Sequence, residues 1–220
     1  MLYEEYLLRE REMKLGNLAV FAKNNKAWLT GTLDDEFKFD YELNGIRFYK
    51  SKVACKRTSG AVDRIPVMVS NQVLPEIDEA ELKGCYVEVA GEYRTKIDDN
   101  NQKSLYLFSK YFRFYYKVED DEDENMLFLS GNLCEEPYFK RTKDDKRVTS
   151  STIAVNRSHR KGAYIPIIAW NKNAGLMQNF KKGAKIELYG RMQSRKHFNK
   201  AGKEVEWYEA SISHISQMVN

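Results

Sequence analysis

The side chains with the most potential for chemistry in this sequence are basic, and they gather in its second half. Residues 1–125 hold 19 Lys or Arg and 24 Asp or Glu, whereas the remaining residues hold 17 and 8. Two predicted loops, together with the fourth predicted strand and its hairpin, carry most of the basic residues, and such convergent charge favours binding to a polymer of phosphates. The candidate phosphate contacts are Lys140, Arg141, Lys143, Arg147, Arg157, Arg160, Lys161, Arg191, Arg195, Lys196 and Lys200.

Aromatic side chains lie among these basic residues. Tyr164 and Trp170 are six positions apart in a short apolar run, so on a strand both point to one face. Tyr138 adjoins the first basic stretch. A flat ring can stack on any base, and together with a basic groove it suits binding to single-stranded nucleic acid. Each ring could instead belong to the core, and each cation alone could be a solvated surface charge.

Catalysis finds no support in the sequence. His159, His197 and His214 are scattered, and there is no HExxH, CxxC or GxxxxGK[ST] pattern. The three cysteines indicate neither a disulfide framework nor a zinc site. The sequence contains no apolar run of membrane-spanning length and does not open with a secretory signal. We therefore expect a cytoplasmic, nucleoid-associated protein without enzymatic activity, cofactor, metal or membrane contact.

The two halves of the chain repeat one another at an offset of 100 residues. Leu29, Gly31 and Leu33 match the same residue types 100 positions later, and Ile65-Pro66 matches Ile165-Pro166. We therefore predict two domains of one fold, at residues 17–117 and 126–220.

The remaining segments are predicted to connect or cap these domains. Six consecutive acidic residues, 119–124, favour an exposed linker over residues 118–125. Alternatively, this run could regulate binding by competing for a basic groove. Residues 1–16 have apolar side chains at roughly helical spacing, which predicts a helix that caps the first domain or docks a partner.

Each domain is predicted to be mainly β. In the second domain one helix follows the third strand, at Lys172–Lys182, and a strand glycine at Gly190 indicates a bulge or bend. Five strands with a helix between the third and fourth are typical of the OB-fold, a small Greek-key barrel, so we predict two such barrels in tandem. A generic small β-barrel is the alternative. The predicted strands of the second domain are Met126–Leu133, Arg147–Asn156, Tyr164–Trp170, Lys185–Gln193 and Val205–Ile215.

The second half also resembles a known family. The order GNLCEEPYFKR, TSSTIAVNR, YIPIIAWNKNA, FKKGAKIELYGRMQSR and AGKEVEWYEASIS is similar to that of bacterial single-stranded DNA-binding proteins. The resemblance covers nearly all of residues 126–216 and implies that Tyr164 and Trp170 stack on DNA bases. It places His197 and Phe198 where the family has a stacking aromatic, with the histidine as a departure. Some members of the family carry two barrels in one chain and pair as dimers, and this chain could be similar.

The first half resembles the family more faintly, in GTL, VACKR, LKG and VAGEYRTK. The positions that match Tyr164 and Trp170 are Arg64 and Ser70, so weaker DNA binding is expected there. Part of its surface could serve self-association or another protein. Candidate contacts in this half are Lys56, Arg57, Arg64, Tyr93 and Lys96.

These patterns predict a protein that coats single-stranded DNA during replication, recombination or repair, largely without sequence preference. Two other hypotheses stay open: a primosome-like scaffold in which OB-folds bind proteins, and binding to RNA or tRNA. The chain ends directly after the last predicted strand, without the acidic tail usual in the family. Replication proteins of a phage or mobile element would then be fitting partners.

Overall fold

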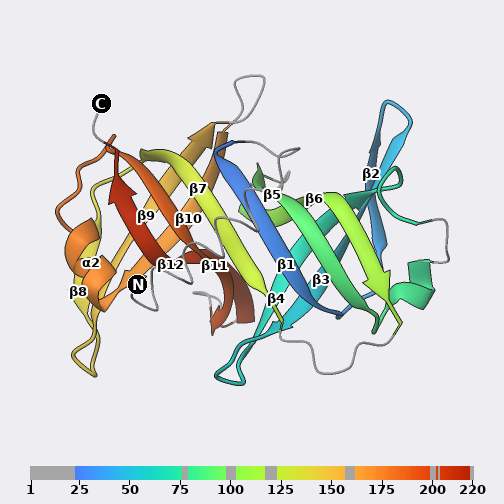
Figure 1. Ribbon diagram of the computed structural model, residues 1–220, viewed down its shortest axis with the longest axis horizontal. Coiled ribbons are helices and arrows are strands. Elements are labelled where there is room, and N and C mark those ends of the chain that lie inside the picture. The colour runs from blue at the N-terminus through green and yellow to red at the C-terminus, as the bar shows by residue number, and fades with distance from the viewer. Residues whose placement is uncertain are drawn as a thin grey trace, which may run out of the picture.

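The first half of the protein is built almost entirely from strands (Figure 1). The structure, a computed structural model, describes residues 23–75, 79–97, 103–116, 123–156, 162–198, 202 and 204–218. The predicted helix at 1–16 and most of the predicted linker lie outside these ranges. The elements of the first half are β1 (Asn25–Leu33), β2 (Lys38–Leu43), β3 (Ile46–Lys56), β4 (Val62–Ser70), the 3-10 helix η1 (Glu79–Leu82), β5 (Tyr86–Ile97) and β6 (Lys103–Tyr115).

The second half repeats this order, so the prediction of a mainly β protein is confirmed. Its last two strands are longer than predicted, and its helix is shorter. The amide side chains of Gln178 and Asn179 bond to the carbonyl oxygen of Gly175, which helps to end the helix. The elements are β7 (Asn125–Leu133), β8 (Tyr138–Arg141), β9 (Arg147–Asn156), β10 (Gly162–Trp170), α2 (Asn171–Met177), β11 (Lys185–Phe198) and β12 (Glu204–Gln217).

In each half the strand pairings close into a circuit of five. In the first half β1 pairs with β3, β3 with β4, β4 with β6, β6 with β5, and β5 with β1. In the second half β7, β9, β10, β12 and β11 follow the same circuit. The pairings β4–β6 and β10–β12 are parallel, and the others are antiparallel. We call β1–β6 the first unit and β7–β12 the second unit.

Two short strands, β2 and β8, were not predicted. Each pairs with one neighbour only, β2 with β3 and β8 with β9, so they form the two edges of the twelve-stranded sheet. Side chains along both are mostly exposed, so the alternation of apolar and polar residues that reveals a half-buried strand is weak there. The predicted basic loop of the second unit therefore begins inside a strand, with Lys140 and Arg141 on β8.

Glycines explain how the strands bend sharply enough to close. The pairing of β11 with β12 shifts register at Gly190, as predicted, and that of β5 with β6 shifts at Gly91. A Cβ atom at Gly190 would lie 2.2 Å from the carbonyl oxygen of Ser211, and one at Gly91 would lie 1.9 Å from that of Phe108. Only glycine allows the two backbones to approach this closely.

The two units join through an antiparallel pairing of β1 with β7, which lie side by side at the centre of Figure 1. Ala27 pairs with Leu127, so the 100-residue repeat makes this contact symmetric about that pair. An amide clamp occurs on both sides of it. The side chain of Asn25 donates to the Tyr93 carbonyl at 2.8 Å and accepts from the Tyr93 amide at 2.9 Å. Asn125 makes the same two bonds with Met192, at 2.7 and 3.0 Å.

This clamp gives a stability prediction. Asn125→Ala leaves the backbone N–H and C=O of Met192 without these partners, so we expect a loss of about 1–3 kcal/mol in the free energy of unfolding, measured with urea. Asn132→Ala is the matched control, because its amide makes an exposed bond to the Gly183 carbonyl. Equal stability of the two variants would show that the clamp contributes nothing.

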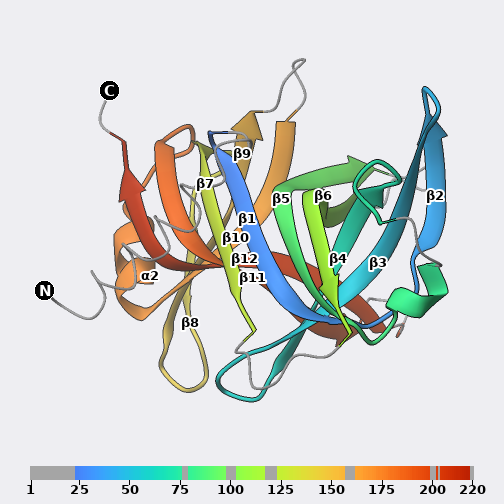
Figure 2. The same ribbon diagram turned by 45° about the vertical axis from the view of Figure 1, so that its right-hand side comes forward.

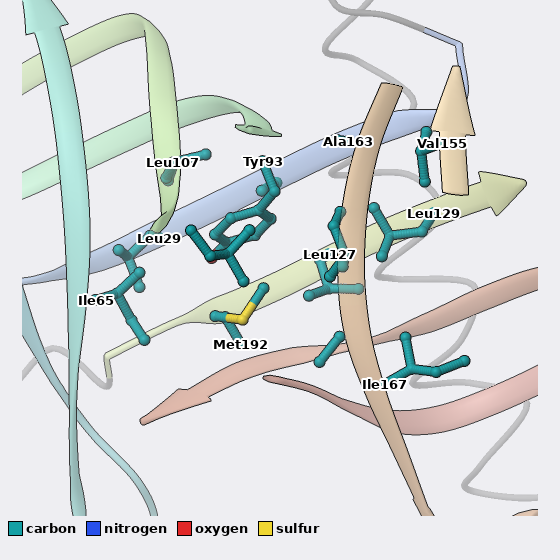
Figure 3. Close-up of a cluster of buried hydrophobic side chains, with 14 of the residues drawn as sticks. Leu29, Ile65, Tyr93, Leu107, Leu127, Leu129, Val155, Ala163, Ile167 and Met192 are labelled. Carbon is teal, nitrogen blue, oxygen red and sulfur yellow. The ribbon is translucent and has the colours of Figure 1, made fainter. Parts of the chain in front are cut away.

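A single hydrophobic core runs through both units (Figure 3). Leu29 and Leu127 lie on the two strands that join the units, and Figure 3 shows the side chains of Tyr93 and Met192 close to them and to each other. Both of these side chains are about 1% exposed. Because the core is shared, the two units hold each other in a fixed orientation.

Candidate nucleic-acid interface

Strand β10 carries two aromatic side chains on its outer side, Tyr164 and Trp170, which are separated by the buried Ile168. Ile165 and Ile167 are buried in the core, so alternation turns Tyr164 and Trp170 to the opposite face. Tyr164 is 49% exposed, and Trp170 is half-buried at the other end of the strand. The structure therefore places both predicted stacking residues on one outer face. Tyr138, on β8, is 66% exposed and lies opposite Ser150 of β9, on the same sheet.

An arginine lies over the Trp170 ring. The Cζ atom of Arg195 is 5.4 Å from the ring centroid, close enough for a cation–π contact. Glu209 holds the guanidinium through a 2.9 Å ion pair and also accepts a 2.7 Å hydrogen bond from Gln193. This network holds the Arg195 guanidinium beside an aromatic face, while Glu209 neutralises part of its charge.

Three exposed cations lie at the β8 edge. Lys140 shares the outer face with Trp170, because both are opposite Val148, whereas Arg147 is on the other face, with its guanidinium near Gly175 of α2. Lys140, Lys143 and Arg147 form no ion pair with any residue in the described ranges, so their charges are available to an anion. Arg141 differs, because it bonds to Asp145 at 2.6 Å. Four of the predicted phosphate contacts, Arg157, Arg160, Lys161 and Lys200, lie outside the described residues.

The remaining candidates lie on β11. Phe198 is 72% exposed, and Lys196 is paired with Glu204 at 2.9 Å. Arg191 lies near Cys55 of the first unit. Its positive charge opposes the effect of burial, which raises the pKa of the Cys55 thiol to about 12. Arg191 is thus at the junction with the first unit rather than among the basic loops. His197 belongs to β11, but its side chain is outside what the structure describes.

In the first unit the prediction for Tyr93 is wrong. Its ring is 1% exposed because residues 87, 89 and 93 share the inward face of β5, so it cannot stack on a base. The alternation of Val87 and Val89 already indicated this direction. The other candidates keep surface positions, and three of them bond to carboxylates through their side chains. These contacts are Arg57 Nε to Asp63 at 2.6 Å, Arg64 Nε to Asp34 at 2.8 Å and Lys96 Nζ to Asp40 at 3.2 Å. The exposed Lys56 bonds to Asp123 only through its backbone N–H, at 2.6 Å.

Sequence reasoning missed an aromatic group on the outer face of the first unit. The rings of Tyr41 and Phe48 stack with centroids 4.7 Å apart, and Arg94 Cζ lies 3.3 Å from the Phe108 centroid. Phe48 is only 8% exposed and so is largely buried, and Tyr41 lies on the unpredicted strand β2. The first unit therefore combines aromatic rings and cations on its surface, but carboxylates neutralise much of its charge.

Groups suited to other chemistry are not gathered in the described part of the chain. There, no three His, Cys, Asp or Glu side chains come together as metal ligands would. The raised pKa of Cys55 keeps that thiol protonated and unreactive near neutral pH. Among the described helices, none has the length and apolar character needed to cross a bilayer.

Comparison with known proteins agrees with the geometry of this face. Residues 124–218 match the model of the "Single-strand binding protein family". The second half of the chain is therefore similar to this family. The match confirms the resemblance found in the sequence, and it includes Tyr164, Trp170, Arg195 and the cations of β8.

Curated single-strand binding proteins are similar over part of this chain. The "Single-stranded DNA-binding protein" of Caldanaerobacter subterraneus subsp. tengcongensis is 36% identical over 78 residues, which cover 32% of this chain and 52% of that protein. The "Single-stranded DNA-binding protein A" of Bacillus subtilis is 32% identical over 88 residues, covering 37% and 51%. The chain thus spans about half the length of the curated relatives it matches.

A solved structure is similar over both units. The wild-type single-stranded DNA binding protein from Thermus aquaticus superposes with a TM-score of 0.71 at 18% sequence identity, over 90% of this chain and 95% of that chain. This likeness concerns the fold. It extends the similarity to the first unit, which the family model leaves unmatched.

Proposed function

We propose that this protein binds single-stranded DNA without catalysis and largely without sequence preference. The observation that carries the proposal is the outer face of the second unit, where Tyr164 and Trp170 lie on one strand with Arg195 over the indole ring. Aromatic faces accept any base, and cations follow the phosphates. The names of the relatives in the same family support DNA as the ligand.

In this proposal both units are OB-folds, at residues 17–117 and 126–220, each with a helical segment between its third and fourth long strands. The second unit holds DNA mainly by stacking, and the first adds weaker contacts. Coating of exposed strands would serve replication, recombination or repair in the cytoplasm, and a homodimer working with replication proteins of a phage or mobile element would be a fitting assembly. The two closed strand circuits and the structural likeness to the Thermus aquaticus protein support this arrangement.

A competition experiment tests the proposal. A labelled oligothymidylate bound to the protein is challenged with unlabelled single-stranded DNA, duplex DNA and RNA at fixed salt. We expect single-stranded DNA to displace the label most effectively, because a duplex hides the faces of its bases. Failure to bind the oligonucleotide at low salt would overturn the proposal, and stronger displacement by RNA would redirect it to RNA.

The cations at the β8 edge give a quantitative prediction. Each phosphate that a protein neutralises on a single strand contributes about 0.7 to the slope of log K against log salt. Lys140→Gln, Lys143→Gln and Arg147→Gln together should therefore reduce this slope by about 2. The control variant replaces Lys181, Lys182 and Lys185, three exposed lysines between α2 and the start of β11. Equal slopes for the two triple variants would contradict the role of the β8 edge.

A further inference from the structure

The hairpin of β11 and β12 is anchored against the first unit. The backbone N–H of Ser194 donates to Asp63 at 2.9 Å, and the N–H of Arg64 donates to the Ser194 hydroxyl at 3.0 Å. A 2.6 Å ion pair joins Lys52 to Glu206 across the same junction. Figure 2 shows these strand ends reaching beneath β1 toward β3 and β4. The end of a second-unit hairpin thus lies at the outer face of the first unit.

Alternation along β11 turns Phe198 to the side of this contact. Ser194, Lys196 and Phe198 share one side of the strand, and Ser194 bonds directly to the first unit. The bond to Glu204 raises the pKa of Lys196, while the nearby positive charge of Arg64 opposes the shift, so Lys196 also faces the first unit. Phe198 is nevertheless 72% exposed, which leaves its ring open to a ligand at the junction.

A cavity of about 260 Å³ lies on the first unit next to this hairpin. Its lining includes Lys38, Lys50, Lys52 and Pro66, and Lys52 is the lysine that pairs with Glu206. Lys38 and Lys50 are directly opposite each other on β2 and β3, an arrangement of like charges that costs stability unless anions compensate it.

Carboxylates supply part of this compensation. Asp40 pairs with Lys50 at 2.9 Å, and Asp35 and Glu36 line the cavity together with the lysines. Lys38 forms no ion pair within the described ranges, and Lys52 depends on a carboxylate from the other unit. An incoming phosphate could therefore bind Lys38 and take the place of Glu206 at Lys52.

We propose that the cavity and the hairpin form a composite nucleotide site, in which a strand of DNA passes between the two units. One base stacks on Phe198, and its neighbouring phosphate binds Lys38 and Lys52. This inference rests on the proposed function, and it assigns to the first unit a site that only the presence of the second unit completes.

A double-mutant cycle with Phe198→Ala and Lys38→Gln tests the composite site. Binding is measured in the full chain with an oligothymidylate of about 30 nucleotides, which is long enough for two OB-type units. We expect Phe198→Ala to weaken binding about tenfold. If the two side chains acted independently, the fold-losses in affinity of the two single variants would multiply in the double variant. We expect the double variant to bind at least about threefold more tightly than that product, because both side chains hold the same nucleotide.

Two further variants make the outcome decisive. Lys83→Gln with Phe198→Ala is the control cycle, because Lys83 is exposed outside the cavity, and its effects should multiply. Glu206→Gln should tighten binding, because it removes the carboxylate that competes for Lys52. Multiplicative effects in both cycles, or weaker binding by Glu206→Gln, would overturn the composite site. If the wild-type chain does not bind at all, the proposed function itself fails.

Discussion

Replacing Tyr164 and Trp170 together with alanine is expected to weaken binding to oligothymidylate by at least about 30-fold. Each base stacked on an aromatic ring contributes about 1–3 kcal/mol, and two rings on one strand face would hold separate bases. The loss should change little with salt, because stacking releases no counterions. It is measured by equilibrium titration at two salt concentrations.

Tyr116→Ala is the matched control for this experiment. Tyr116 is 70% exposed, but it follows β6 of the first unit and its ring packs edge-on against Phe114. We expect this variant to bind like the wild type. If the double variant retains wild-type affinity, the outer face of β10 does not hold the bases, and the stacking mechanism is wrong.

The second large effect concerns stability. Gly190→Ala would place a Cβ atom 2.2 Å from the carbonyl oxygen of Ser211, and the obstacle is backbone of the paired strand rather than a side chain that could rotate away. Strand β11 or β12 would have to move, and the bulge that bends the sheet would be disturbed. We expect a loss of about 3 kcal/mol in the free energy of unfolding, which for a chain of this size lowers the melting temperature by roughly 10 °C.

Gly162→Ala provides the comparison, since a Cβ atom there would meet its nearest neighbour, an atom of the Tyr164 ring, at an ordinary 3.5 Å. Its melting temperature should stay within about 2 °C of the wild type. Thermal unfolding followed by circular dichroism separates the two variants. Coincident melting curves would mean that the strands tolerate separation at Gly190.

Much of the second unit could be predicted from the sequence because its strands alternate clearly. The bounds of β9 agree with the prediction, and the bulge at Gly190 follows from a glycine within an alternating strand. The outward position of Tyr164 and Trp170 follows from the same alternation around Ile165 and Ile167. The edge strands β2 and β8 lacked this signal, because little of either is buried.

The pairing state of the cations could not be predicted. Lys140 and Arg141 are neighbours of one type in the sequence, but only Arg141 has an acidic residue placed by a turn to bond with it. Arg64 meets Asp34 across 30 positions, and Lys52 meets Glu206 across 154. Contacts at such separations depend on the register of several strands and on the junction between units, neither of which leaves a local pattern.

The junction between units likewise depends on side chains that look unremarkable in the sequence. Asn25 and Asn125 are matched by the 100-residue repeat, yet an asparagine on a strand gives no sign that it will clamp the backbone of another. Their role becomes evident only when β1 and β7 are paired about Ala27 and Leu127.

The most direct test of the central claim is the fluorescence of Trp170 during a titration with oligothymidylate. Trp28→Phe and Trp207→Phe leave Trp170 as the sole tryptophan. We predict strong, saturable quenching of Trp170, with the affinity falling steeply as salt rises, because a base stacks on the indole ring while cations hold the phosphates. Binding without any change in Trp170 fluorescence, or no binding even at low salt, would contradict the assignment of this face as the site for single-stranded DNA.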